Sequence, residues 1–153
     1  MIKQYFNYWL FKLHATNQHG VHSPFLFALV CSCFYNKNWR KMRTTPWNSK
    51  KQDIISTLIL NQLQLFIDQS TNEFKIDPLK IVFSKNKALS EYSEELKAIE
   101  EPQLTLIDNL HLQRESWRIL NNTKQFVLLD LYFFGIIIQR PQQNAEIHFL
   151  KIF

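Results

Sequence analysis

Two histidines three residues apart, His19 and His22, lie in the stretch HGVHSPF and are the first candidates for chemistry. Imidazole groups bind zinc or transfer protons near neutral pH. A zinc site needs three or four converging ligands, and this pair has no carboxylate or thiolate beside it in the sequence. We therefore predict no metal site, and we expect both rings to hydrogen-bond to backbone groups at the start of a helix.

A second polar cluster follows a predicted buried strand. The stretch LTLIDN ends in Asp108 and Asn109, and His111 comes two residues later. Ligands of open α/β sheets bind outside the carboxyl ends of the strands, so these three residues are our candidates for catalysis. The alternative is that Asp108 only caps the following turn. Asp130 lies inside the apolar run FVLLDLYFFG, so it must be paired or at a strand edge. It faces the same crevice or bonds to a basic residue of the N-terminal arm.

The composition argues against several other kinds of site. Gly20 and Gly135 are the only glycines, and they are too far apart in the sequence to form a Walker or GxGxxG loop, each of which needs closely spaced glycines. Cys31 and Cys33 are two residues apart in an apolar run, so we expect buried, reduced thiols and no disulfide between them. No Ser/His/Asp or Cys/His nucleophile pattern is recognisable.

Helices are predicted to dominate the N-terminal part of the chain. A helix over 2–15 is indicated by apolar residues at helical spacing, namely Ile2, Tyr5, Phe6, Trp9 and Leu13. Ser23 fits an N-cap and Pro24 the first helical position, which predicts a helix over 24–35 that is apolar nearly all round and buried. A third helix is predicted over 51–68.

Strands and helices alternate in the rest of the chain. Strands are predicted at 80–83, 104–108, 126–131 and 134–139, helices at 89–100 and 113–121, and a last extended piece at 146–152. This order is typical of an α/β fold. We expect a basic, aromatic-rich helical segment, 1–68, packed on an α/β portion, 69–153, in one compact domain.

Charge is unevenly distributed along the chain. The net charge is +5, and residues 1–52 contain no Asp or Glu. Such an arm fits RNA, an acidic partner or an anionic membrane surface, or it packs on the slightly acidic remainder of its own chain. The candidate basic patch comprises Lys37, Arg40, Lys41, Arg43, Lys50 and Lys51, and the candidates for stacking on bases are Tyr35, Trp39 and Trp47. No leader or membrane-spanning pattern is recognisable, so we expect a cytoplasmic protein.

HGVHSPF resembles the N-terminal signature, HG(V/I)HSPF, of a bacterial family of class I S-adenosylmethionine-dependent methyltransferases. LTLIDNLHLQRESWRIL is similar to that family's strand ending in Asp-Asp-Ile-His-Trp and its Trp-containing helix. FVLLDLYFFGIIIQRPQQNAEIHFLKI resembles its closing hairpin with a glycine and a final Glu-x-His-Phe. The resemblance covers residues 1–68 and 100–153. It implies that a substrate or partner crevice is lined by His19, His22, Ser23, Asp130 and Trp117.

The middle of the chain departs from the family. Its members carry there a first strand with a glycine-containing loop for the methionine part of the cofactor, and a second strand whose acid holds the ribose. Here residues 69–100 contain no glycine. The resemblance implies that Lys80–Phe83 is a remnant of the fourth strand. The resemblance implies a truncated Rossmann-like sheet of about four strands, mixed, with a C-terminal hairpin. Asp108 and Asn109 also resemble the divalent-metal pair of catechol-type O-methyltransferases, but the further acid has no candidate.

Three functions are consistent with these observations. The first is a degenerate, non-catalytic binding or scaffold subunit that uses no cofactor and pairs with itself or with a partner covering a sheet edge. The second is an active S-adenosylmethionine-dependent methyltransferase with an atypical or partner-completed cofactor site. The third is an RNA-binding module that uses the basic arm. We favour the first, because such enzymes depend on holding and aligning the cofactor, and the loop that does so is missing.

Overall fold

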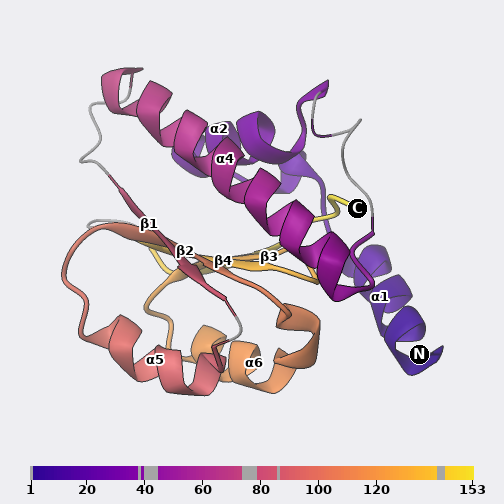
Figure 1. Ribbon diagram of the computed structural model, residues 1–153. Coiled ribbons are helices and arrows are strands. Elements are labelled where there is room, and N and C mark those ends of the chain that lie inside the picture. Colours follow the sequence, from indigo (N-terminus) through magenta and orange to yellow (C-terminus); the bar gives the residue numbers. More distant parts are fainter. Residues whose placement is uncertain (1, 38, 40–44, 74–78, 86, 141–143) are drawn as a thin grey trace.

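The computed structural model describes residues 2–37, 39, 45–73, 79–85, 87–140 and 144–153. They form five α-helices and one five-stranded mixed sheet (Figure 1). The strands are β1 (Lys80–Ser84), β2 (Gln103–Ile107), β3 (Val127–Asp130), β4 (Gly135–Gln139) and β5 (Glu146–Phe149). The prediction of a mixed sheet is confirmed, with one strand more than the four expected, because Glu146–Phe149 pairs with β3 as a regular strand.

The sheet order is β1-β2-β4-β3-β5. β1 and β2 are parallel, as are β3 and β5, whereas β4 runs antiparallel to both of its neighbours. The hairpin predicted near the C-terminus is therefore present, and its second strand lies between β2 and β3 at the centre of the sheet.

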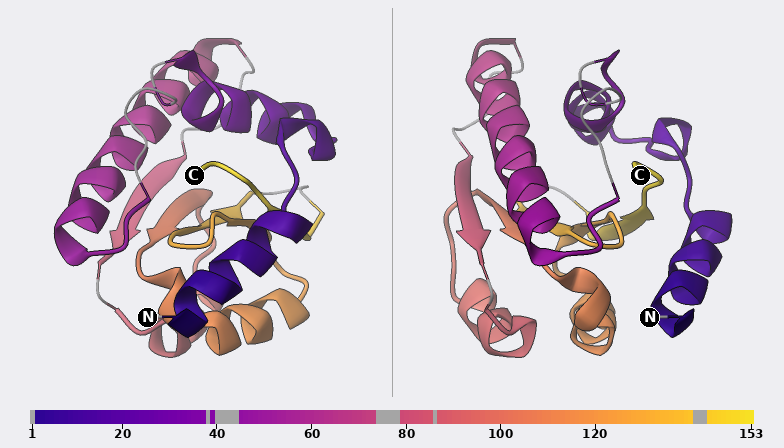
Figure 2. Two further views of the ribbon diagram at one scale, coloured as in Figure 1. Left: turned by 90° about the vertical axis from the view of Figure 1, so that its right-hand side faces the viewer. Right: turned by 45° about the vertical axis from the view of Figure 1, so that its right-hand side comes forward.

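Helices cover both faces of the sheet. They are α1 (Ile2–His14), α2 (Pro24–Phe34), α4 (Ser49–Glu73), α5 (Leu89–Lys97) and α6 (Arg114–Asn122). α2 and α4 lie over one face and α5 and α6 over the other, which gives three layers (Figures 1 and 2). Every residue of β2 is buried, as expected for a strand with both faces covered. No helix formed by the described residues is long and apolar enough to cross a membrane.

Two apolar cores result, one on each face. Leu128 and Leu129 follow each other in β3 and belong to different cores, because successive side chains of a strand point to opposite faces. The core under α2 and α4 is the larger and contains Leu29 and Ile59. The core under α5 and α6 contains Trp117.

The predicted helices are confirmed, with α4 longer than expected. The N-cap of α2 is also confirmed, because the backbone N–H of Leu26 donates to the Ser23 hydroxyl oxygen (3.5 Å) and Pro24 is the first helical residue. The apolar residues whose spacing predicted α1 are exposed and not buried. They are Tyr5, Phe6, Trp9 and Leu13.

α1 is held to the rest of the molecule by its opposite side. The ring of Tyr8 lies 4.9 Å from that of Tyr132 and 5.4 Å from that of Phe133, and the ring of Phe11 lies 5.3 Å from that of Tyr132. The Tyr132 hydroxyl also donates to the Gln4 carbonyl oxygen (3.0 Å). Because Tyr132 and Phe133 follow β3, α1 lies against the end of the sheet at which β2 and β3 finish.

The first and last parts of the chain lie side by side. Beyond α1, the N–H of Thr16 donates to the Phe149 carbonyl oxygen (2.8 Å), and the N–H of Lys151 donates to the Thr16 carbonyl oxygen (2.9 Å). Thr16 thus forms an isolated parallel bridge with Leu150, next to β5. This bridge fixes where the chain leaves α1 for the HGVHSPF turn.

Candidate functional site

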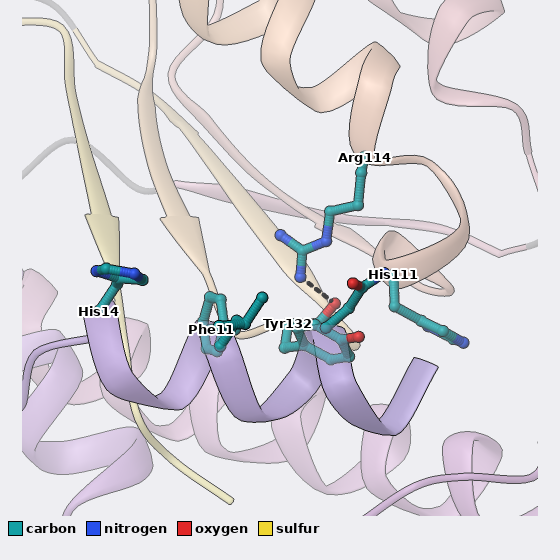
Figure 3. A pocket seen from close by; sticks show the side chains of 7 residues that line it. Phe11, His14, His111, Arg114 and Tyr132 are labelled. Atoms are coloured by element: carbon teal, nitrogen blue, oxygen red, sulfur yellow. Dashed lines mark hydrogen bonds between the residues drawn. The ribbon is translucent and has the colours of Figure 1, made fainter. Parts of the chain in front are cut away.

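A cleft of about 300 Å³ lies between α1 and the loops that follow β2 and β3 (Figure 3). Its lining comes from α1, from the loop after β2, from the start of α6 and from the loop after β3: Asn7, Leu10, Phe11, His14, His111, Arg114 and Tyr132. The loops after β2 and β3 belong to the carboxyl ends of parallel strands, where ligands of open α/β sheets bind. This cleft is therefore the candidate site.

An ion pair supports the floor of the cleft. Asp130 at the end of β3 is fully buried, and Arg114 Nη1 contacts its Oδ2. Arg114 Nη2 donates to the Tyr132 carbonyl oxygen (2.8 Å), and the Tyr132 N–H donates to Asp130 Oδ1 (2.9 Å). Burial raises the pKa of the Asp130 carboxyl above its ordinary value, while the Arg114 guanidinium and the Tyr132 N–H oppose that rise. The expected basic partner of Asp130 therefore comes from α6 and not from the N-terminal arm.

His111 contributes a neutral ring to the cleft. Its ring stacks on that of Tyr132 (6.1 Å between centroids) and meets the edge of Phe133 (5.1 Å). Burial, and secondarily the charge of Arg114, lowers the pKa of His111 to about 4. Its Nδ1 is buried and has no hydrogen-bond partner among the described residues. At neutral pH the uncharged ring can form a hydrogen bond with a ligand, but its low pKa makes it a weak base.

The other two catalytic candidates lie beside the cleft. Asp108 directly follows β2 and is buried, and Asn109 adopts left-handed backbone dihedrals (φ 53°), which turn the chain sharply. The N–H of Leu110 then donates to the Phe133 carbonyl oxygen (2.9 Å) and joins the two strand-end loops. The structure thus brings Asp108, Asn109 and His111 into one loop, in which His111 alone is among the cleft-lining residues described.

Trp117 belongs to the core and is not among the residues that line the cleft. A Cβ atom built on Gly135 would lie 2.8 Å from Trp117 Cη2 and 3.2 Å from Leu110 Cδ2. The indole therefore fills the space beside Gly135. Glycine is required at this position by close packing, since its φ is not positive.

The HGVHSPF turn is separate from this cleft. His19 lies in a short 3₁₀ helix, Gln18–Gly20, where its backbone N–H donates to Asn17 Oδ1 (3.0 Å). Both imidazoles, of His19 and His22, are exposed. Neither ring bonds to another described residue, so the expected ring-to-backbone bonds are not formed. Ser23 is occupied as the N-cap of α2. The cleft lining includes none of these three residues, and their role in a crevice stays a prediction.

The described ranges contain neither a recognisable metal site nor a reactive thiol. No three His, Cys, Asp or Glu side chains there are grouped so as to hold a metal ion. Cys31 and Cys33 are free thiols, which agrees with the prediction of no disulfide. Burial raises the pKa of Cys33 to about 12, and it also raises that of half-buried Cys31, so both are protonated at neutral pH.

The basic patch is only partly described. Lys37, Lys50 and Lys51 are exposed, whereas Arg40, Lys41 and Arg43 lie outside the described residues. The aromatic candidates for base stacking belong to the core or pack against it. Trp39 is fully buried and its indole N–H donates to the Ile152 carbonyl oxygen (3.4 Å). Trp47 and Tyr35 are half-buried and pack on the larger core.

Sequence reasoning missed Arg114 and Tyr132. A signal for Arg114 existed, because a carboxylate such as Asp130 inside an apolar run requires a cation nearby. What the sequence lacked was the placement of α6 beside the end of β3. Tyr132 has a φ of 69°, and the turn between Asp130 and Gly135 was the only hint of such a conformation.

Comparisons with known protein families, with curated proteins and with solved structures give no match to this chain.

Proposed function

We propose that this chain is a degenerate methyltransferase-like protein that binds a partner and does not transfer methyl groups. The observation that carries the proposal is that β1 is the edge strand of the described sheet, with no described counterpart beside it of the strands that hold the cofactor in the family. Residues 69–100, where the family carries its glycine-containing loop, have no glycine. The methyltransferase part of the proposal rests on the resemblance of HGVHSPF and of the late strands.

The sheet order supports a truncated Rossmann-like assignment. β1 and β2 are parallel and joined through α5, and the chain closes with a hairpin whose second strand begins at Gly135. The final Glu-x-His-Phe forms β5, in which His148 Nε2 lies 2.9 Å from Glu146 Oε2. If β1 is the fourth strand of the parent sheet, the lost strands belong at its other edge, which pairs with no described strand.

S-adenosylmethionine does not fit the residues present. The family resemblance implies a glycine-containing loop, and neither loop after β1 or β2 contains a glycine. Gly20 lies in the 3₁₀ helix after α1, Gly135 is packed against Trp117, and neither has a positive φ. Asp108, the acid at the end of β2, is buried. We therefore assign no step of a reaction to this cofactor.

The edge of β1 is the proposed partner surface. An unpaired edge strand offers a row of backbone N–H and C=O groups to another strand. Ile81, Val82 and Phe83 are half-buried there, between the exposed Lys80 and Lys85. A second copy of the chain or another protein with a free strand can extend the sheet at this edge.

Two measurements on the full chain test the proposal. Calorimetry with S-adenosylhomocysteine should give no heat of binding, while circular dichroism confirms that the protein is folded. Light scattering should give a mass above that of the monomer, and Val82→Lys should lower it, because a charge on an edge strand opposes pairing. Leu65→Lys, at an exposed position of α4, is the matched control and should leave the mass unchanged. Micromolar binding of S-adenosylhomocysteine, or a monomer that recovers no partner, contradicts the proposal.

The cleft favours a second candidate, an enzyme whose cofactor site is completed by a partner. Arg114, His111 and Tyr132 meet at the carboxyl ends of β2 and β3 although Trp117 closes the position beside Gly135. This candidate predicts that S-adenosylhomocysteine gives heat only when the partner bound at the β1 edge is present. Absence of heat from the purified complex would remove it.

A further inference from the structure

The outward face of α1 exposes five large hydrophobic side chains. Phe6 and Trp9 are each 58% exposed and Leu13 is 60% exposed, and Tyr5 and Leu10 accompany them. Single exposed hydrophobic residues are common on protein surfaces, but five on one 13-residue helix form a continuous apolar patch. Such a patch indicates an interaction surface.

The patch is flanked by positive charge. With 3.6 residues per turn, the five side chains cover an arc of roughly 140° around the helix axis. Lys3 and Lys12 lie at its two margins, and α1 contains no acidic residue. The ring of Trp47 packs 4.2 Å from that of Tyr5, so the chain segment that leads to Lys50 and Lys51 also passes close to α1.

The outward orientation of this patch is fixed by packing. Tyr8 and Phe11 hold the other side of α1 against Tyr132 and Phe133, and the Tyr132 hydroxyl bonds to the Gln4 carbonyl. Rotating the helix to bury the patch would break these contacts and expose Tyr8 and Phe11 instead. The five hydrophobic side chains therefore remain available to a partner.

We propose that this face of α1 binds the interface of an anionic lipid bilayer. Helices that lie in a membrane interface combine an apolar face of Trp, Phe and Leu with Lys or Arg at its margins, which reach the phosphate groups. At 1.5 Å per residue α1 is about 20 Å long, too short to cross a hydrocarbon core of about 30 Å. The helix therefore lies along the surface, with the folded body on the aqueous side.

Charge favours a lipid surface over a second copy of the chain. Two copies packed through α1 would bring Lys3 and Lys12 of one near those of the other, and the helix faces would carry charge of the same sign, since α1 has no Asp or Glu. An anionic surface attracts the same lysines, at roughly fivefold in partitioning for each one close to it. RNA would bind the lysines and stack bases on the aromatic rings, but it would leave Leu10 and Leu13 exposed to water.

The test is co-sedimentation of the full chain with vesicles. Vesicles of phosphatidylcholine with about one-third phosphatidylglycerol should bind the protein, and vesicles of phosphatidylcholine alone should bind it much less. Binding should weaken as salt is raised, and the emission of the exposed Trp9 should shift to shorter wavelength on binding. The double variant Trp9→Ser/Leu13→Ser should lower partitioning more than tenfold. Leu65→Ser/Ile119→Ser is the matched control, since it removes equally exposed apolar residues elsewhere and should bind like the parent.

Two results would overturn the proposal. One is absence of binding to anionic vesicles at low salt by protein that circular dichroism shows to be folded. The other is a dimer in light scattering that Trp9→Ser/Leu13→Ser converts to monomer, because the patch would then be an interface between copies. As an independent check of charge, Lys3→Gln/Lys12→Gln should weaken binding to anionic vesicles roughly thirtyfold and leave the weak binding to neutral ones unchanged.

Discussion

α1 and α2 are both rich in apolar residues, yet they place these residues in opposite surroundings. α2 packs against α4 over one face of the sheet, and its Leu26, Leu29 and Val30 are fully buried. α1 contacts the body of the protein along one side only, and it is the more regularly patterned face that is exposed. Apolar spacing therefore predicts that a segment is helical, whereas the elements that pack against the helix decide which of its faces is buried.

The largest effect is expected from a substitution that removes the side chain supporting α1. Arg114→Met should lower the free energy of unfolding by about 3 kcal/mol, because it leaves the Asp130 carboxylate buried without its cation. The Arg114 guanidinium also lies over the rings of Phe11 (5.4 Å) and Tyr132 (4.6 Å), so hydrogen exchange in α1 should accelerate. Denaturant unfolding and hydrogen exchange measure the two effects.

Arg118→Met is the control on the same helix. Arg118 pairs with Glu115, but both side chains are 69% exposed, and such surface pairs contribute little. Its loss should change neither the stability appreciably nor the exchange in α1. Equal losses for Arg114→Met and Arg118→Met would mean that the buried pair does not anchor α1.

Truncating one leucine in each helix tests directly whether α2 is buried and the outward face of α1 is exposed. Leu29→Ala in α2 should cost 2–5 kcal/mol, because the side chain is fully buried and its removal leaves a cavity. Leu13→Ala in α1 should cost less than about 0.5 kcal/mol, because that side chain is 60% exposed. Urea unfolding of both variants decides the point, and comparable costs would show that α1 is buried in solution.

A smaller effect is expected from pH, through His111 beneath α1. The pKa of His111 is about 4 in the folded protein and 6.5 in the unfolded chain, so the unfolded chain binds the additional proton between these values. This contribution to stability is complete above pH 6.5 and is lost as the pH falls towards 4. Because the ring is partly exposed, we expect a loss on the order of 1–2 kcal/mol.

The difference between the parent and His111→Phe isolates this contribution from other acid-sensitive groups. The stability of His111→Phe should fall less steeply between pH 6.5 and 4, whereas His22→Phe, at an exposed histidine, should follow the parent. Parallel curves for the parent and His111→Phe would show that the imidazole is not desolvated as the structure places it.

Local patterns predicted most of the secondary structure. They placed the five α-helices and the strands of the described residues to within a few residues, but not the short 3₁₀ helices. The Ser23-Pro24 pair placed the start of α2, because capping is decided by neighbours in sequence. The order of elements indicated the α/β class, whereas the mixed sheet was expected only from the family resemblance. The outward face of α1 could not be predicted, because it depends on where Tyr132 and Phe133 lie after β3.

The candidate site was only partly predictable for the same reason. Asp130 was recognisable from its apolar surroundings, but its pairing with Arg114 joins two elements through the packing of α6. Asp108, Asn109 and His111 were expected to form a polar cluster at the crevice, and of the three only His111 is among the cleft-lining residues described. The resemblance of HGVHSPF implied crevice residues at His19 and His22, and neither is among the residues that line this cleft.

The central position of β4 has a consequence for synthesis of the protein. β4 joins β2 to β3 in the sheet, and it follows both of them in the chain. While the ribosome is still translating the earlier elements, the strands already made cannot form one sheet, because the strand that connects them does not yet exist. The nascent chain must therefore keep the apolar residues of β2 and β3 from aggregating until β4 has been made, and it is in this interval that we expect it to depend most on chaperones.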